Sequence, residues 1–98
     1  MTLGLRRAGF EVVAAIEIDD LAAETYRLNH PNTFLLEEDI RRVDASAFAR
    51  RVLGRRKRLD LLAACPPCQG YSEVRTLRHR LAAPDQRNKL VFEVLRFI

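Results

Sequence analysis

The stretch EVVAAIEIDDLAAETYRLNHPNTFLL, residues 11–36, decides the fold of this chain. It begins with Glu11–Ile16, a short apolar run rich in valine and bounded by charge, which is typical of a buried strand. A helical pattern follows over about residues 20–29, and Thr33–Leu36 has the composition of a second short strand. The stretch therefore predicts a strand–helix–strand unit.

Short polar signals mark both ends of the helix in this unit. Asp19 or Asp20 can cap its N-terminus, because a carboxylate there accepts hydrogen bonds from the first free backbone amides. The string His30-Pro31-Asn32 ends it, since the residue before a proline avoids the helical conformation. One stripe of the helix is predicted to hold three residues: Leu21, Thr25 and Leu28.

The same alternation of helix and strand continues on both sides of this unit. Residues 3–8 resemble the end of a helix, and Asp44 can cap another helix over about residues 45–53, which Gly54 ends. Leu59–Ala64 is predicted to be a third strand. A last helical stripe is predicted for five apolar residues near the end of the chain: Leu90, Val91, Val94, Leu95 and Ile98.

Strands that alternate with helices of about ten residues predict an α/β fold with a parallel sheet. In such sheets, ligands bind beyond the carboxyl ends of the strands. Three polar groups come at the predicted strand ends, namely Glu17, Asp39 and the loop Cys65–Ser72. We therefore expect these groups to converge on one crevice.

Length and composition limit what this chain can be. Its 98 residues make one domain at most, and 48% hydrophobic with 31% charged residues excludes a disordered chain. No apolar run is long enough for a membrane span or a signal-peptide core, so we expect a cytoplasmic protein and no membrane partner. The net charge of +4 is compatible with a polyanionic partner. The chain starts inside a predicted helix and stops inside an apolar stripe, so we expect residues 1–98 to be a partial domain, truncated at both ends.

The loop Cys65–Ser72, with the sequence CPPCQGYS, contains both cysteines of the chain. A cysteine in a loop at a strand end is placed to act as an exposed nucleophile. The two prolines fix the backbone before Cys68, and Gly70 permits a tight turn. The reacting species is the thiolate, so the site must lower the pKa of the thiol or supply a base.

Four ordered segments resemble the motifs of one known family, the cytosine-5 DNA methyltransferases. PPCQGYS, residues 66–72, resembles the family's PCQ motif, and AGFEVVAAIEIDDLAAETYRLNHP, residues 8–31, is similar to its second motif. Glu38-Asp39-Ile40 is similar to the third motif, and residues 85–98 to the fifth. The resemblance implies a partial Rossmann-like fold dependent on S-adenosyl-L-methionine, with a parallel sheet lacking its first strand.

The resemblance also implies roles for individual residues. Cys68 would be the nucleophile that adds to carbon 6 of a cytosine, so that carbon 5 can accept a methyl group from S-adenosyl-L-methionine. Pro67 would shape the cytosine pocket, and Gln69 and Ser72 would contact the substrate in the same loop. Five residues would bind the cofactor: Glu17 through the ribose hydroxyls, Asp39 through the adenine amino group, Ile18 and Ile40 by packing on the adenine, and Leu90 beside the methionine part.

DNA is the partner that the resemblance implies, with its target cytosine flipped out of the duplex. Three arginines that follow the loop would contact phosphates: Arg75, Arg78 and Arg80. RNA is the alternative substrate, because a minority of the family acts on transfer RNA. The 98 residues contain neither the family's glycine-rich first motif nor its Glu-Asn-Val motif. We therefore expect the chain alone to be inactive, and a separately encoded remainder is one further partner.

Other functional interpretations of these residues remain open. The pair Cys65-x-x-Cys68 has the spacing of a thiol–disulfide redox site, in which Cys65 would be essential. Half of a zinc site would need His30 and His79 or a partner chain. A basic nucleic-acid-binding module without catalysis would use the arginines but would leave the PCQ string unexplained.

Overall fold

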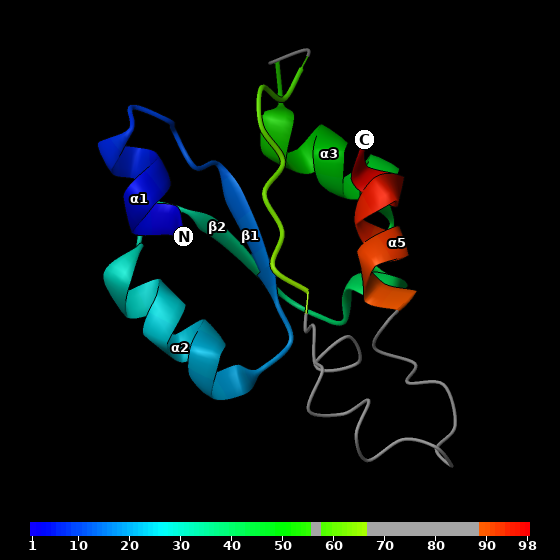
Figure 1. Ribbon diagram of the computed structural model, residues 1–98, viewed down its shortest axis with the longest axis horizontal. Helices are drawn as coiled ribbons and strands as arrows, with labels where there is room; N and C mark the ends of the chain where they lie inside the picture. Colours follow the sequence, from blue (N-terminus) through cyan, green and yellow to red (C-terminus); the bar gives the residue numbers. More distant parts are fainter. Residues whose placement is uncertain (56–57, 67–88) are drawn as a thin grey trace, which may run out of the picture. The chain divides into compact units, whose positions relative to one another are not determined.

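The computed structural model describes residues 1–55, 58–66 and 89–98, and it divides the chain into two compact units, Met1–Arg58 and Leu59–Ile98. The first unit is a small α/β structure (Figure 1). Its helices and strands follow one another in this order: α1 (Thr2–Arg7), β1 (Ala14–Glu17), α2 (Asp20–Asn29), β2 (Phe34–Glu37), the 3-10 helix η1 (Ile40–Arg42) and α3 (Ala45–Leu53).

The strands β1 and β2 form a parallel pair, as the alternation of elements predicted. Their register runs from Ala14 opposite Phe34 to Glu17 opposite Glu37. Both strands therefore start and end later than predicted, and Glu17 is the last residue of β1 instead of following it. The reason is that a strand extends only as far as its partner supplies hydrogen bonds, which an apolar run in the sequence cannot reveal.

Helix α2 has the predicted bounds, but a different side of it is buried. Asp19 caps it by accepting a 2.8 Å hydrogen bond from the amide of Ala22. Ala23 is fully buried, whereas Leu21 and Leu28 are 73% and 78% exposed. The predicted stripe therefore points away from the core of this unit. Leu21 and Leu28 are two and five positions from Ala23, which places them on the opposite side of a helix with 3.6 residues per turn. Helix α2 therefore approaches the strands through the small side chain of Ala23.

Helix α3 also has the predicted bounds and both predicted end signals. The Asp44 carboxylate accepts a 3.0 Å hydrogen bond from the amide of Ala47, and Gly54 ends the helix at a φ of 53°. Such a left-handed φ favours glycine. The Phe48 ring lies 6.1 Å from that of Phe34 in β2, so α3 packs on the sheet through an aromatic pair. Figure 1 shows α3 on the side of the sheet opposite to α1 and α2.

Polar contacts connect α1 to the rest of the first unit. Thr2 is buried and shares a 3.0 Å hydrogen bond with the Tyr26 hydroxyl of α2. The Arg6 guanidinium donates to the Thr33 hydroxyl at 2.8 Å, and that hydroxyl donates to the carbonyl of Val12 at 3.3 Å. Buried hydroxyls of this kind must be hydrogen-bonded to avoid a desolvation penalty, and here the bonds position α1 against α2 and the start of the strands.

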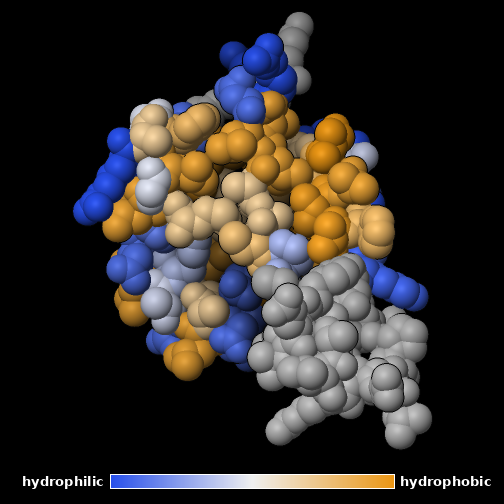
Figure 2. Space-filling view, viewed as in Figure 1, coloured by the Kyte–Doolittle hydropathy of each residue, from blue (hydrophilic) through white to orange (hydrophobic). Residues whose placement is uncertain are grey.

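Few apolar side chains are fully buried in the described part of the chain. Only Ala23 and Val43 are buried hydrophobic residues there, and many large apolar side chains are exposed. Figure 2 shows this apolar surface as extensive orange areas on the face in view. Burial of apolar area is the main favourable term in folding, so the described residues have a small core.

The second unit holds helical turns at its C-terminal end. They are the short helix α5 (Leu90–Val94) and the 3-10 helix η4 (Leu95–Phe97), which confirm the predicted helix there. The predicted strand over Leu59–Ala64 is wrong, because the described residues of this unit include no strand. An apolar run becomes a strand only when a neighbouring strand pairs with it. In the described ranges, no helix is long and apolar enough to span a membrane.

Candidate site at the carboxyl edge of the sheet

The two strands bring the acidic residues of two separate sequence segments to one edge of the sheet. Glu17 and Glu37 are opposite each other in the last register position. One residue further, the amide of Glu38 donates a 3.0 Å hydrogen bond to the carbonyl of Glu17. The chain leaving β2 therefore stays beside the end of β1, and Asp39 follows directly. Two of the three groups predicted to converge, Glu17 and Asp39, thus lie at the same edge.

The Glu17 carboxylate is held by the backbone that follows it. Its Oε1 atom accepts hydrogen bonds from the amides of Ile18 at 2.9 Å and of Asp19 at 3.2 Å. These bonds orient the side chain at the turn between β1 and α2. The other oxygen, Oε2, makes no hydrogen bond within the described ranges, and a carboxylate oxygen there can accept from hydroxyl groups of a ligand.

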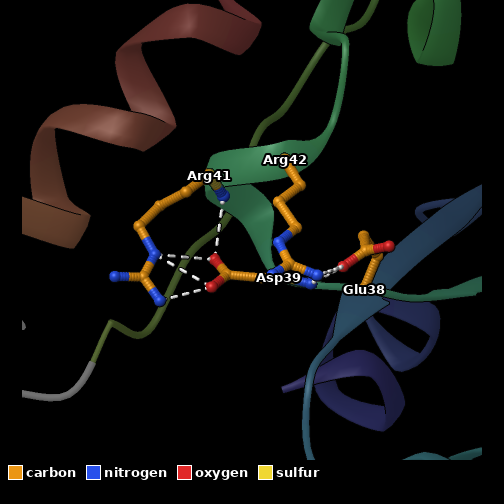
Figure 3. A network of polar contacts seen from close by, with 4 residues as sticks. All are labelled: Glu38, Asp39, Arg41 and Arg42. Atoms are coloured by element: carbon orange, nitrogen blue, oxygen red, sulfur yellow. Dashed lines mark hydrogen bonds and ion pairs between the residues drawn. The ribbon is translucent and has the colours of Figure 1, made fainter.

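The Asp39 carboxylate is held by Arg41 (Figure 3). Oδ1 accepts from the Arg41 amide at 3.0 Å and from Nε at 2.9 Å, and Oδ2 accepts from Nε at 2.9 Å. The Nη2 atom of Arg41 also forms an ion pair with Oδ2. The bond to the Arg41 amide makes Asp39 the N-terminal cap of η1. The sequence analysis did not predict a role for Arg41, although an arginine two residues after an aspartate at a turn is close enough to form such a pair.

A second pair lies beside the first. Glu38 accepts a 2.9 Å hydrogen bond from the amide of Asp39, and its carboxylate lies 4.0 Å from the Arg42 guanidinium. Figure 3 shows the two arginines directed to different carboxylates. At the end of β2, Glu37 forms an ion pair with Arg27 of α2. The acidic turn is therefore not a bare cluster of negative charge, because each of these three carboxylates has a cationic neighbour.

The hydrogen bonds from the Arg41 side chain and backbone lower the pKa of Asp39 from 3.8 to about 2. Both groups stabilise the ionised form, and the positive charges of Arg41 and Arg42 act in the same direction. Asp39 therefore remains an acceptor of hydrogen bonds well into the acid range.

This shift predicts a pH dependence of stability. The folded pKa lies below the unfolded one, so the ionised Asp39 contributes its full stabilisation above pH 3.8 and loses it as the pH falls towards 2. Urea unfolding of the wild-type chain and of Asp39→Asn, at a series of acid pH values, measures this contribution. The difference in free energy of unfolding between the wild type and Asp39→Asn should narrow as the pH falls from 3.8 towards 2. A difference that is independent of pH would contradict the assignment.

The remaining predicted cofactor residues are found in different surroundings. Ile18 is 62% exposed at the turn after β1, and Ile40 is half-buried as the first residue of η1. Both are adjacent in sequence to the acidic residues of the edge, so an apolar ligand surface could contact them there. Leu90 is half-buried and begins α5 in the second unit.

The predicted catalytic loop is described only at its beginning. Cys65 is exposed and Pro66 is half-buried. The other residues assigned to catalysis or to substrate contact lie outside the described residues and stay predictions: Pro67, Cys68, Gln69, Ser72, Arg75, Arg78 and Arg80.

In open parallel sheets, ligands bind beyond the carboxyl ends of the strands, which is the edge where Glu17 and Asp39 lie. Comparison with known proteins identifies the class. The family model for C-5 cytosine-specific DNA methylases matches residues 1–98, and the chain belongs to this family.

Curated relatives agree with this assignment. The chain is 36% identical to the type II methyltransferase M.NgoPII of Neisseria gonorrhoeae, over all of the chain and 26% of the relative. It is 32% identical to M1.HphI of Haemophilus parahaemolyticus over 99% of the chain and 25% of the relative, and 33% identical to M.AquIA of Picosynechococcus over all of the chain and 38% of the relative. The chain thus spans between a quarter and two fifths of the length of these relatives. No solved structure matches it.

Proposed function

We propose that this chain supplies the cofactor edge and the nucleophile of a DNA (cytosine-5-)-methyltransferase. The observation that carries the proposal is the register of β1 and β2, with Glu17 at the end of β1 and Asp39 two residues beyond the end of β2. Both residues belong to segments that resemble the family's second and third motifs. Membership of the family supports the same conclusion.

The residues at this edge have the chemistry that S-adenosyl-L-methionine requires. Glu17 keeps an oxygen for the ribose hydroxyls, and Asp39 is an ionised acceptor for the adenine amino group. Ile18 and Ile40 would offer apolar surface to the adenine ring, and the resemblance to the family assigns Leu90, in the second unit, to the methionine part. When bound, the cofactor supplies the methyl group.

The reaction is carried by Cys68 in this proposal. Its thiolate forms a bond to carbon 6 of cytosine, and the electron pair of the ring double bond makes carbon 5 nucleophilic. After carbon 5 has accepted the methyl group, it loses its proton to a water molecule, the C5–H electron pair re-forms the ring double bond, and the sulfur leaves carbon 6 as thiolate. Covalent addition thus divides one difficult step into easier ones.

The DNA contacts are those that the resemblance of this loop to the family's PCQ motif implies. Pro67, Gln69 and Ser72 flank the nucleophile and would surround the flipped cytosine. The three arginines after the loop would hold phosphates, at Arg75, Arg78 and Arg80. Binding through such contacts weakens as the salt concentration rises.

An exchange of segments tests the proposal. The 98 residues replace the matching stretch of M.NgoPII from Neisseria gonorrhoeae, to which they align over their whole length. We expect this chimera to transfer tritiated methyl groups from S-adenosyl-L-methionine to duplex DNA. We expect the 98-residue chain alone to show no transfer, because it holds neither the glycine-rich motif nor Glu-Asn-Val.

M.NgoPII itself is the positive control for this exchange. A chimera that folds and binds DNA but transfers no methyl group, with the parent active in the same assay, would contradict the proposal. Turnover by the isolated chain would contradict the expectation that other segments are needed.

A further inference from the structure

The Arg41 guanidinium takes the acceptor positions that a ligand would need on Asp39. A carboxylate has about four lone-pair sites. The Arg41 amide and Nε approach Oδ1, and Nε and Nη2 approach Oδ2. The Asp39 side chain is only 13% exposed, whereas that of Arg41 is 56% exposed. The Arg41 side chain therefore contacts both oxygens of the carboxylate and is itself more exposed than the carboxylate that it holds.

We propose that Arg41 is a positioning residue that acts as a latch on the adenine subsite, because its guanidinium must leave Asp39 before an adenine amino group can bind there. This inference rests on the proposed function. An amino group is a hydrogen-bond donor, and a guanidinium has only donors, so the two compete for the same oxygens. The Arg41 amide, which belongs to the backbone of η1, keeps its bond to Oδ1 when the side chain swings away.

The latch can open because its guanidinium is 56% exposed and can move into solvent. Exposed ion pairs contribute little free energy, and solvent screens them. The closed arrangement still lowers the apparent affinity, since only the fraction of molecules with an open latch can bind the ligand. Arg42 has no such effect, because it is directed to Glu38 at 4.0 Å.

Nuclear magnetic resonance titration of the 98-residue chain with adenosine tests the latch. Adenosine is neutral and carries both the ribose hydroxyls and the amino group. We expect Arg41→Ala to bind adenosine about two- to fivefold more tightly than the wild-type chain, which corresponds to the loss of an exposed ion pair. Arg42→Ala is the matched control and should bind as the wild type does. Inosine lacks the amino group, so Arg41→Ala should bind it no more tightly than the wild-type chain does.

Two further measurements separate a latch from a merely structural role. Raising the salt concentration from about 0.01 to 1 M shortens the Debye length from about 30 to 3 Å. The higher salt concentration should tighten the binding of adenosine to the wild type more than to Arg41→Ala, because only the wild type has an Arg41–Asp39 ion pair to screen. The pKa of the Asp39 carboxyl, followed without ligand, should rise from about 2 towards 3.8 in Arg41→Ala.

The outcomes distinguish the latch from the proposed function. If adenosine shifts the resonances of Glu17 and Ile18 in every variant, but Arg41→Ala binds equally or more weakly, the latch is overturned and the cofactor edge stands. If adenosine shifts none of these resonances in any variant, the adenine subsite is overturned, and the latch with it. Tighter binding by Arg42→Ala as well as by Arg41→Ala would show that general charge is responsible, and would also overturn the latch.

Discussion

Replacing Cys68 with serine is expected to abolish methyl transfer by the chimera with M.NgoPII, with a loss of at least about a thousandfold in rate. A serine hydroxyl is far less acidic than a thiol, so almost no anion would be present to attack carbon 6 of the cytosine. The change removes little volume and should leave folding and DNA binding intact. The measurement is the initial rate of tritium transfer at saturating cofactor and DNA.

Cys65→Gly is the matched control for this experiment, because it changes the other cysteine of the same loop. Cys65 is exposed, and the proposed mechanism gives it no role, so the rate should stay within about twofold of the parent chimera. A thiol–disulfide site predicts the reverse, namely that both cysteines are essential. Loss of transfer in Cys65→Gly, or retention in Cys68→Ser, would contradict the assignment of the nucleophile.

Replacing Glu17 with glutamine is expected to weaken the binding of S-adenosyl-L-methionine by the same chimera by about thirtyfold, or about 2 kcal/mol. Hydrogen bonds to an ionised acceptor are stronger than those to a neutral one. The glutamine keeps one oxygen, which can still accept from the amides of Ile18 and Asp19. The turn between β1 and α2 should therefore survive, while the other carboxylate oxygen, which accepts hydrogen bonds, is replaced by an amide nitrogen, which donates them.

Glu37→Gln is the control for Glu17→Gln. Glu37 occupies the same register position on the neighbouring strand, but its carboxylate pairs with Arg27 of α2. Isothermal titration calorimetry should show an almost unchanged Kd for this variant. Equal weakening by the two substitutions would mean that the total charge of the edge matters, and would contradict a specific role for Glu17.

The helices of the first unit could be predicted from local signals. Asp19 and Asp44 each precede a helix and accept a hydrogen bond from the amide three residues later. Gly54 adopts a left-handed φ at the end of α3. These contacts involve residues close in sequence, so the pattern of residue types was sufficient to locate both helices.

Strands and buried faces depended on partners far away in the chain. The apolar run Leu59–Ala64 forms no strand, although its composition resembles that of β1. Leu21 and Leu28 are exposed while the small residue Ala23 is buried. Neither result could be predicted from periodicity, because pairing and burial are properties of the neighbours that an element meets.

Motif order and residue type were enough to indicate the family, since motifs depend on chemistry carried by short segments. Tertiary structure alone decided that Glu17 lies opposite Glu37 and that the turn after β2 continues beside the end of β1. The physical reason is that a parallel register joins residues about twenty positions apart. A carboxylate is then bound by whichever donors the folded backbone brings within hydrogen-bond distance.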